Sequence, residues 1–438
     1  MAFDNADLFP VTASIDGRNH LTLGGCNTTD LAEQYGTPVY VYDEETLRMM
    51  CREFTREFTK RYPATKVLYA AKAFVNPALA RLLTEEGLGL DVVSGGELAV
   101  AKVAGFPPER IYFHGNNKGK TELEMAVRGH IGRVVVDNFY ELRLLDEIAR
   151  QHDVIQDILL RLSPGVDPHT HAKTTTGVLD SKFGLSIETG DAEQAIQLAL
   201  SLPNVRLMGI HFHLGSPIFE LEPYSIATDT VLTFIARFIS DGLSLEELST
   251  GGGFAIGYLR DQLPPTIASY ADAIVTTMKR RCGDLGISEP TLVVEPGRAI
   301  VGRAGVSLYT VGAMKDVPGV RKYVSLDGGM GDNIRPAMYD SPYEAVLASR
   351  MSDPESERVT LAGKFCESGD VLVRDIDMPI LEPGDLIAIP AVGAYAPAMA
   401  NNYNLNPKPA IVMVKDGRSR LIRRRETHED MMHLDVLD

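Results

Sequence analysis

The sequence lacks the features that mark disulfide-stabilised, zinc-binding and membrane-spanning proteins. It has only four cysteines in 438 residues, Cys26, Cys51, Cys282 and Cys366. None belongs to a C-x-x-C pair, so neither a disulfide framework nor a zinc site is indicated. We expect the first three to be buried, inert thiols. No apolar run reaches the roughly 18 residues that a membrane span requires, so no membrane partner is expected.

Positive charge is also scarce. The chain has 43 Lys and Arg against 59 Asp and Glu, which gives a formal net charge of -16. Nucleic acid is therefore not an expected partner, because phosphate backbones bind basic surfaces. Residues 1–10 contain no Lys or Arg and no apolar stretch, unlike a secretory or transit segment. We expect a cytoplasmic protein whose ligand is a small molecule.

Short apolar segments alternate with helical patterns from about residue 43 to residue 300. The candidate strands are residues 66–72, 89–94, 111–115, 133–137, 158–162, 207–213, 245–251 and 291–296. Most are continuous apolar runs, which is typical of parallel strands buried on both faces. Eight such strands over ~250 residues predict an α/β fold with a (β/α)8 barrel. The alternative, a doubly wound open sheet, needs a glycine loop after its first strand, and no glycine lies near Lys72.

After residue 305 the pattern changes to shorter strand-like runs separated by turn signals. The runs are VSLYTVGAM, KYVSLDGG, DLIAIPA and AIVMVK. They indicate a C-terminal β-rich domain, either a barrel or a sandwich. The strand-like residues 37–43 are expected to pair with this domain. The predicted organisation is therefore an N-terminal segment at 1–42 that joins the β domain, a barrel at 43–305 and the β domain at 306–438.

The predicted strands all end in polar residues or glycines. These are Lys72, Asp91 with Ser94, His114, Asp137, Arg161 with Ser163, His211 with His213, Gly251 to Gly253, and Glu295 with Arg298. In a barrel of this kind, catalytic residues lie at the C-terminal ends of the strands. A strand end without a functional role would more often be followed by an ordinary turn. The pattern therefore favours a single site in which these side chains lie together.

Three of these strand ends suggest particular chemistry. A lysine that points into a barrel mouth, such as Lys72, must be paired or desolvated, and a desolvated amine suits Schiff-base chemistry. Glycines 251–253 could bring backbone N–H groups to a phosphate. A carboxylate such as Glu295, placed against a pyridine nitrogen, would keep that nitrogen protonated. The alternatives are an exposed strand-end lysine, a flexible turn, and a surface turn with an ion pair between Glu295 and Arg298.

The segment HFHLGS places His211 and His213 on the same face of a predicted strand, two residues apart. Two histidines can bind a metal, but no third ligand with suitable spacing follows, so no metal is expected. A ring stacked on a flat aromatic cofactor is the better interpretation for one of them.

Taken together, the motifs resemble those of the diaminopimelate decarboxylase family. They are YAAKAF around Lys72, DVVSGGEL (91–98), HGNNK (114–118), TTGVLDSKFGL (175–185), HFHLGS (211–216), GGGFAIGY (251–258), EPGRAIVG (295–302), IRPAMY (334–339), CESGD (366–370), GAYAPAMANNYN (393–404) and IRRRET (422–427). The resemblance runs from about residue 35 to the C-terminus with spacing kept. It implies a fold-type III enzyme that uses pyridoxal 5'-phosphate, with an alanine-racemase-like barrel, a C-terminal β domain, and a homodimer with shared active sites.

The resemblance also implies a role for individual positions. Lys72 would hold the cofactor covalently, His213 would stack on its ring and Glu295 would face its pyridine nitrogen. The phosphate would be bound by Ser216, Gly251, Gly252, Gly253, Gly297, the backbone of Arg298 and Tyr395. The substrate would be bound by Arg298, Arg335, Tyr339, Glu367 and Tyr395. Cys366 and Glu367 would come from the partner subunit, with Cys366 as the acid that returns a proton to the substrate.

The implied reaction is decarboxylation of meso-2,6-diaminopimelate to L-lysine and CO2, the last step of lysine biosynthesis. This substrate carries an amino acid at each end. Selectivity therefore needs an anion-binding group and a cation-binding group at the end that does not react, for which Arg335 with Tyr339 and Glu367 are suited. Relatives that act on ornithine have Asp after the cysteine, where this chain has Glu367.

Two departures from the family pattern leave other substrates open. Pro217 replaces the usual Gln, and Pro342 with Tyr343 replaces the usual Tyr-His pair. The alternatives are a decarboxylase of D-lysine, D-ornithine, ornithine, arginine or carboxynorspermidine, a racemase on the same barrel, and a non-catalytic protein that binds pyridoxal phosphate. A racemase needs a second base across the cofactor, and the non-catalytic proteins typically lack a domain like residues 306–438.

Overall fold

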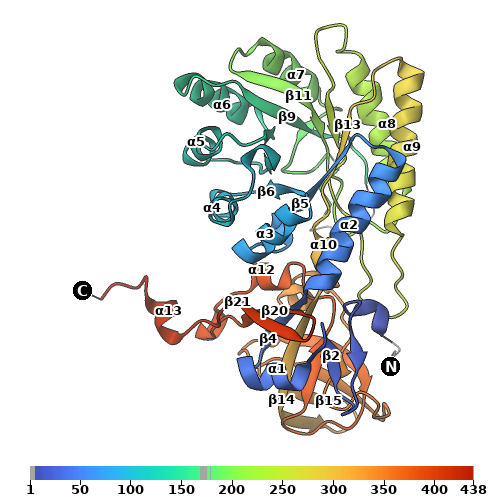
Figure 1. Ribbon diagram of the computed structural model, residues 1–438, viewed down its shortest axis with the longest axis vertical. Coiled ribbons are helices and arrows are strands. Elements are labelled where there is room, and N and C mark those ends of the chain that lie inside the picture. The colour runs from blue at the N-terminus through green and yellow to red at the C-terminus, as the bar shows by residue number, and fades with distance from the viewer. Residues whose placement is uncertain (1–4, 168–174, 178, 438) are drawn as a thin grey trace. The chain divides into compact units, whose positions relative to one another are not determined.

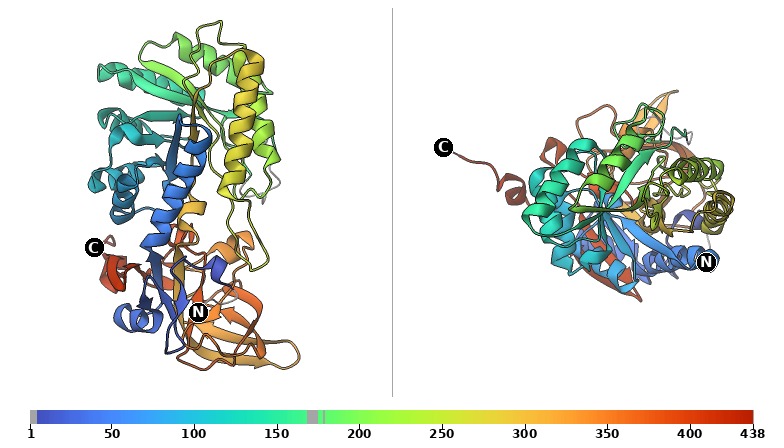
Figure 2. Two further views of the ribbon diagram at one scale, coloured as in Figure 1. Left: turned by 45° about the vertical axis from the view of Figure 1, so that its right-hand side comes forward. Right: turned by 90° about the horizontal axis from the view of Figure 1, so that it is seen from above.

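The computed structural model describes residues 5–167, 175–177 and 179–437 (Figures 1 and 2). The chain divides into two compact units. The barrel unit comprises residues 50–255 and 264–297, and the β unit comprises residues 1–49, 256–263 and 298–438. The boundaries expected from the sequence, at 42/43 and 305/306, stay a prediction.

Eight parallel strands form a closed barrel. They are β5 (Thr65–Ala70), β6 (Gly89–Val92), β7 (Ile111–Phe113), β8 (Arg133–Val136), β9 (Gln156–Ser163), β11 (Val205–His211), β12 (Glu247–Ser249) and β13 (Thr291–Val294). The barrel closes because β8 pairs with β9 and β13 pairs with β5. Its interior is filled by Leu68, Tyr112, Val135, Leu159, Met208 and Val293, which come from six different strands. The predicted (β/α)8 barrel is therefore confirmed.

The helices of the barrel lie outside its strands (Figure 2). They are α2 (Glu44–Arg61), α3 (Pro77–Glu85), α4 (Gly95–Ala104), α5 (Lys120–Arg128), α6 (Phe139–Gln151), α7 (Asp191–Ser201), α8 (Glu222–Ala236) and α9 (Ile267–Leu285), with the short η3 (Pro108–Arg110) and β10 (Leu185–Ser186) between them. Polar caps fix several helix starts. Asn76 accepts from the backbone N–H of Leu79 (2.9 Å), and Asn138 accepts from that of Glu141 (3.0 Å).

Seven of the eight predicted strands extend beyond the C-terminal end of the observed strand, and two of them illustrate the effect. β5 ends at Ala70, and Lys72 lies in the following 3-10 turn η2 (Ala71–Ala73). β11 ends at His211, so His213 lies beyond the strand, and the expectation of two histidines on one strand face is wrong. A polar residue after an apolar run can be the last residue of the strand or the first residue of the loop, and the sequence pattern does not distinguish the two.

The β unit is built on a nine-stranded sheet. Its strands are β4 (Val39–Asp43), β14 (Gly305–Val317), β15 (Arg321–Leu326), β16 (Val346–Leu347), β17 (Glu357–Ala362), β18 (Val371–Met378), β19 (Leu386–Ile389), β20 (Ala410–Lys415) and β21 (Arg418–Arg423). β4 pairs antiparallel with β14 and parallel with β20, so the N-terminal segment is part of this sheet.

Shorter elements complete the β unit. They are η1 (Ala6–Leu8), β1 (Ser14–Ile15), β2 (Leu21–Leu23), β3 (Cys26–Asn27), α1 (Thr28–Tyr35), α10 (Arg298–Val301), α11 (Arg335–Tyr339), α12 (Ala396–Met399), η4 (Tyr403–Leu405) and α13 (His428–Met432). Among the described helices, none combines the length and apolarity that crossing a bilayer requires. Cys26, Cys51 and Cys282 are buried, as expected, whereas Cys366 is exposed.

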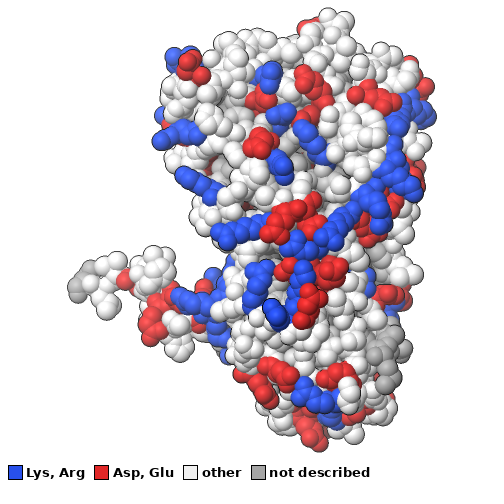
Figure 3. All heavy atoms as spheres, in the orientation of Figure 1, with Lys and Arg blue, Asp and Glu red and all other residues white. Residues whose placement is uncertain are grey.

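Basic residues along α2 are paired with acids. Within the barrel unit, Arg52 pairs with Glu86 (2.8 Å), and Glu57 pairs with both Arg56 (2.9 Å) and Arg61 (2.8 Å). On the face drawn in Figure 3, acidic residues accompany the basic ones. The row of basic side chains on α2 is therefore largely neutralised.

Candidate active site

The carboxylate of Glu295 is held on both of its oxygens by groups from other strands. Oε1 accepts a hydrogen bond from Ser249 Oγ (2.8 Å) and lies 3.4 Å from His114 Nε2. Oε2 lies 3.1 Å from His211 Nε2. All four residues are buried. Because β11, β12 and the residue after β7 supply these partners, the closed barrel fixes the orientation of the carboxylate.

The protonation states in this cluster follow from burial and charge. Burial alone would raise the pKa of Glu295, but His114 and His211 outweigh it and hold that pKa well below its usual range. Burial lowers the pKa of His211 to about 4, although Glu295 opposes the shift. At neutral pH, Glu295 is therefore an anion, and a neutral His211 can donate to it from Nε2.

A second group of charges lies at the same end of the barrel. Asp91 Oδ1 is 3.6 Å from His114 Nε2, and Asp137 Oδ1 is 3.7 Å from Arg161 Nε. The Arg161 guanidinium lies 4.5 Å from the centre of the Phe183 ring. Burial raises the pKa of both Asp91 and Asp137. The barrel mouth thus combines buried acids and bases, which is typical of a catalytic site.

Lys72 and His213 offer an amine and a flat ring. Lys72 is exposed, which matches the alternative of an exposed lysine and not the expected paired or desolvated amine, and its amine forms no hydrogen bond or ion pair within the residues that the structure describes. Burial, with the positive charge of Lys72, lowers the pKa of His213 well below its usual range. The imidazole is therefore neutral, and its Nδ1 accepts a hydrogen bond from the backbone N–H of Gly252 (3.3 Å), which orients the ring.

The glycines after β12 are sterically required. Gly251 (φ +68°) and Gly253 (φ +102°) adopt left-handed backbone conformations. A Cβ atom at Gly251, Gly252 or Gly253 would come within 2.6, 2.3 or 2.5 Å of a backbone oxygen. Steric exclusion of larger residues favours a tight backbone cradle over the alternative of a flexible turn.

In the β unit, Arg298 starts α10 and is buried. Its Nη1 donates to the hydroxyl of Tyr258, and its guanidinium lies 4.7 Å from the centre of the Tyr395 ring. Tyr395 has a left-handed backbone (φ +70°), where it precedes α12. Two aromatic rings therefore position this cation.

Arg335 starts α11 in the same unit and is also buried. Its Nη1 donates to Tyr343 Oη (2.6 Å) and its Nη2 donates to Ser341 Oγ (3.1 Å). Among the described residues, none of its hydrogen-bond partners is a carboxylate. Tyr339 follows four positions later, on the same face of the helix. A buried guanidinium with only neutral partners is a candidate anion-binding group.

Cys366 and Glu367 lie in the connection between β17 and β18, and both are exposed. The backbone N–H of Cys366 donates to Asn404 Oδ1 (2.8 Å), which fixes the start of the CESGD segment. The thiol and the carboxylate are therefore both accessible from the surface.

Not every predicted strand-end residue faces the cluster around Glu295. Ser94 instead caps α4 by accepting from the backbone N–H of Glu97 (3.2 Å). Ser163 Oγ bonds to the backbone oxygen of Gly177 (3.4 Å). The sequence reasoning missed Ser249, although a serine inside a buried strand was the available signal.

Glu97 was also missed. Burial raises its pKa to about 7, and the charge of Asp91 adds to this shift. The sequence could not have singled out Glu97. Acidic residues are common in the first turn of a helix, and Glu97 lies in the first turn of the helix that Ser94 caps.

The structure also qualifies the argument about metal. His114, His211 and Glu295 place ligand atoms within 4.8 Å of one another, in a geometry that could hold a metal ion. Of the two histidines considered from the sequence, only His211 belongs to this group, and its other two members follow other strands. That no metal binds stays a prediction.

The chain is similar to known pyridoxal-dependent decarboxylases. Residues 48–302 match the family described as pyridoxal-dependent decarboxylase, pyridoxal binding domain. The diaminopimelate decarboxylase of Bacillus subtilis is 46% identical over 427 residues, which are 97% of either chain. The diaminopimelate decarboxylase of M. jannaschii, solved with L-lysine, has a TM-score of 0.92 and 37% identity over 100% of this chain and 99% of its own. A lysine/ornithine decarboxylase of Vibrio vulnificus, solved with putrescine, has a TM-score of 0.76 and 25% identity over 89% and 97%.

Proposed function

Because the chain belongs to the diaminopimelate decarboxylase family of pyridoxal-dependent decarboxylases, we propose that it converts meso-2,6-diaminopimelate to L-lysine and CO2. The observation that carries this choice of substrate is the buried Arg335, whose hydrogen-bond partners among the described residues are all neutral. A buried cation of this kind needs an anion, and the carboxylate at the non-reacting end of diaminopimelate can supply one. Substrates such as ornithine or D-lysine have no carboxylate at that end.

The residues at the barrel mouth fit pyridoxal 5'-phosphate, which we propose as the cofactor. The anionic Glu295 suits a protonated pyridine nitrogen, the neutral ring of His213 suits stacking, and the exposed amine of Lys72 suits covalent attachment. The cradle of Gly251 to Gly253 suits a phosphate. We assign Ser216, Gly297, the Arg298 backbone and Tyr395 to the same phosphate, and the Arg298 side chain to the substrate. When bound, this cofactor supplies an electron sink for the electron pair left at Cα as CO2 departs.

The chain's own groups then have separate tasks. Glu295, held anionic by its partners, would keep the pyridine nitrogen of a bound cofactor protonated. The Arg298 side chain, Arg335 and Tyr339 bind the distal carboxylate, and Glu367 binds the distal ammonium, so that the substrate is selected by its non-reacting end. Cys366 Sγ returns a proton to Cα after CO2 has left.

We further propose a homodimer in which Cys366 and Glu367 of one subunit complete the site of the other. Their exposure on the β unit supports a role toward a partner surface. A cytoplasmic location also stays a prediction.

The experiment that tests the reaction is CO2 release by the purified protein loaded with pyridoxal phosphate. Meso-diaminopimelate, D-lysine, D-ornithine, L-ornithine and L-arginine are offered in parallel. We expect kcat/KM to be highest for meso-diaminopimelate by at least about 100-fold, since the other four leave Arg335 without its anion. Preference for one of the other four would overturn the assignment of Arg335. No release from any substrate would favour a racemase or another reaction on this scaffold.

A further inference from the structure

Tyr258 contacts both Arg298 and Arg335, the two arginines to which the proposed function assigns substrate binding. It ends the segment GGGFAIGY, and the reaction described above gives it no task. Its side chain is buried, and its hydroxyl accepts a hydrogen bond from Arg298 Nη1. The Arg335 guanidinium lies 4.9 Å from the centre of its ring, and that of Arg298 lies 5.8 Å from it. One tyrosine therefore contacts both cations.

Tyr343 contacts both Arg335 and Tyr258. Its hydroxyl accepts from Arg335 Nη1 (2.6 Å), and its ring meets that of Tyr258 edge to face, with centroids 5.3 Å apart and an interplanar angle of 83°. All four side chains belong to the β unit. Arg298, Tyr258, Arg335 and Tyr343 thus form one continuous contact group.

Tyr258 and Tyr343 contact these two cations without contributing a negative charge of their own. Buried guanidiniums repel each other, and a carboxylate between them would relieve the repulsion but would consume the charge that an incoming anion needs. The aromatic face of a tyrosine attracts cations, and its phenol oxygen accepts their hydrogen bonds. The tyrosine side chain itself adds no charge. The pKa of Tyr258 reflects this balance, because burial raises it but the two arginines outweigh burial and lower it.

We propose that Tyr258 is a positioning residue that holds Arg298 and Arg335 as a fixed pair for a carboxylate of the substrate. The inference rests on the proposed function for the identity of that substrate. The placement of the two guanidiniums by Tyr258 is a property of the β unit itself. It follows that Tyr258 contributes to the preference for a substrate with a distal carboxylate over one without it.

The test compares Tyr258→Phe with the wild type as the full-length enzyme loaded with pyridoxal phosphate. The substitution removes only the hydroxyl that accepts from Arg298. We expect KM for meso-diaminopimelate to rise about tenfold, with a smaller change in kcat, because a charged hydrogen bond that orients the cation is lost. Turnover of D-lysine, which has no distal carboxylate, should change less than threefold, so the preference for meso-diaminopimelate falls.

A matched control is Tyr62→Phe in the barrel unit. Tyr62 is also buried, and its hydroxyl donates to the backbone oxygen of Pro290 (2.9 Å). This variant loses one tyrosine hydrogen bond without touching either arginine. If Tyr62→Phe shifted KM as much as Tyr258→Phe, the effect would be a general loss of stability, and the proposal would be wrong. If Tyr258→Phe does not fold, Tyr343→Phe removes the neutral acceptor of Arg335 and should shift the same KM in the same direction.

A binding measurement separates failure of this inference from failure of the proposed function. Pimelate, a seven-carbon dicarboxylate without amino groups, is titrated into the loaded wild type and Tyr258→Phe by calorimetry. If the wild type does not decarboxylate meso-diaminopimelate but binds pimelate about tenfold more tightly than the variant, the proposed reaction is wrong and the role of Tyr258 stands. If substrate preference and pimelate affinity are the same in both proteins, Tyr258 does not position the arginines.

Discussion

At the scale of single residues, Glu295 owes its ionisation to side chains that are distant in sequence. The sequence indicates a carboxylate at the end of a strand, and no more. Its partners His114, His211 and Ser249 become neighbours only because the barrel closes. Among them, His211 is the contact to Oε2, so its removal should have the clearest effect.

We predict that His211→Phe weakens cofactor binding. The substitution keeps a ring of similar size and removes the Nε2 donor, so the pKa of Glu295 should rise. Affinity for pyridoxal phosphate should fall about tenfold near pH 6 and less at pH 8, because protonation of Glu295 at the lower pH removes the charge that faces the pyridine nitrogen. Absorbance titration of the cofactor-free protein measures this. His152→Phe, at an exposed position after α6, is the control, and matching pH curves for the two variants would refute the role of His211.

Asp332 in the β unit offers a prediction about stability. Burial raises its pKa from the ordinary 3.8 to about 7, and Asp327 and Asp370 add to the shift, while the Gly329 N–H opposes it. The folded state thus binds this proton more tightly than the unfolded state. The resulting stability is fully present below about pH 4 and is lost as the pH rises through 7.

Asp332→Asn should remove this pH dependence. An asparagine stays neutral at every pH, and its side-chain oxygen can still accept from the Gly329 N–H. We expect the fall in Tm between pH 5 and pH 8 to be smaller in the variant than in the wild type by about 3 °C. Differential scanning calorimetry at both pH values tests this, and parallel Tm curves would show that Asp332 is not protonated in the folded protein.

At the scale of helices and strands, the sequence indicates where the barrel strands are but not where they end. Continuous apolar runs identify β5 to β9 and β11 to β13, because parallel strands are buried on both faces. Lys72 and His213 were misplaced because polarity changes at the loop and not at the last backbone hydrogen bond. β17 and β18 were missed, since half-exposed strands such as VLVRDIDM mix polar and apolar residues.

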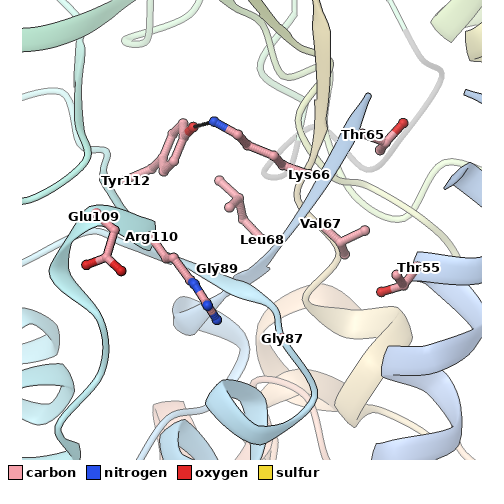
Figure 4. A pocket seen from close by; sticks show the side chains of 10 residues that line it. All are labelled: Thr55, Thr65, Lys66, Val67, Leu68, Gly87, Gly89, Glu109, Arg110 and Tyr112. Carbon is pink, nitrogen blue, oxygen red and sulfur yellow. Dashed lines mark hydrogen bonds between the residues drawn. The ribbon is translucent and has the colours of Figure 1, made fainter. Parts of the chain in front are cut away.

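The N-terminal ends of the barrel strands carry a charge cluster that the sequence did not reveal. Glu247, at the start of β12, is buried and accepts hydrogen bonds from Lys66 Nζ (2.6 Å), Tyr112 Oη (2.9 Å) and Arg133 Nη2 (2.9 Å). Figure 4 shows Lys66 and Tyr112 directed toward each other at a hollow of about 260 Å³. Burial would raise the pKa of Glu247, but Lys66 and Arg133 outweigh it and lower that pKa.

We predict that Glu247→Gln destabilises the barrel without changing catalysis. The substitution removes an anion shared by Lys66 and Arg133, and because Lys66 is half exposed and Arg133 keeps its ion pair with Asp157 (3.0 Å), the cost should be about 1–2 kcal/mol. Unfolding by urea at pH 7 should shift to a lower midpoint, while KM and cofactor affinity should stay at wild-type values at 25 °C, since the cluster lies at the strand ends opposite Glu295. The adjacent and exposed Glu246→Gln is the control. An unchanged midpoint would mean that the three donors are satisfied without Glu247.

At the scale of the whole molecule, the site residues predicted from the sequence are divided between the two units. The barrel unit supplies Lys72 and Glu295, and the β unit supplies Arg335 and the exposed pair Cys366 and Glu367. Composition and periodicity alone give the barrel and the β-rich region. The roles of individual residues came from the resemblance, because side chains that act together are spread over some 300 positions. Whether Cys366 serves its own chain or a partner is a question of assembly that mixing variants can answer.

We predict that two inactive variants regain activity when mixed. Lys72→Ala loses cofactor attachment, and Cys366→Ala loses the proton donor, so each alone should be nearly inactive. If subunits exchange at random, half of the dimers are mixed, and each mixed dimer holds one site with both Lys72 and Cys366 intact. The mixture should then reach about a quarter of wild-type CO2 release. If both residues acted within one chain, no mixed dimer would contain a complete site, and the mixture would stay inactive.

The control for this experiment mixes Lys72→Ala with Glu295→Ala. Both residues belong to the barrel unit, so every mixed dimer has a defect in each of its two sites, and no activity should return. Light scattering and exchange of differently tagged subunits establish that dimers form and reassort under the mixing conditions. Recovery with the Cys366 variant and none with the Glu295 variant would assign the thiol to the partner's site, because only a residue donated across the interface can complement a barrel that lacks its own donor.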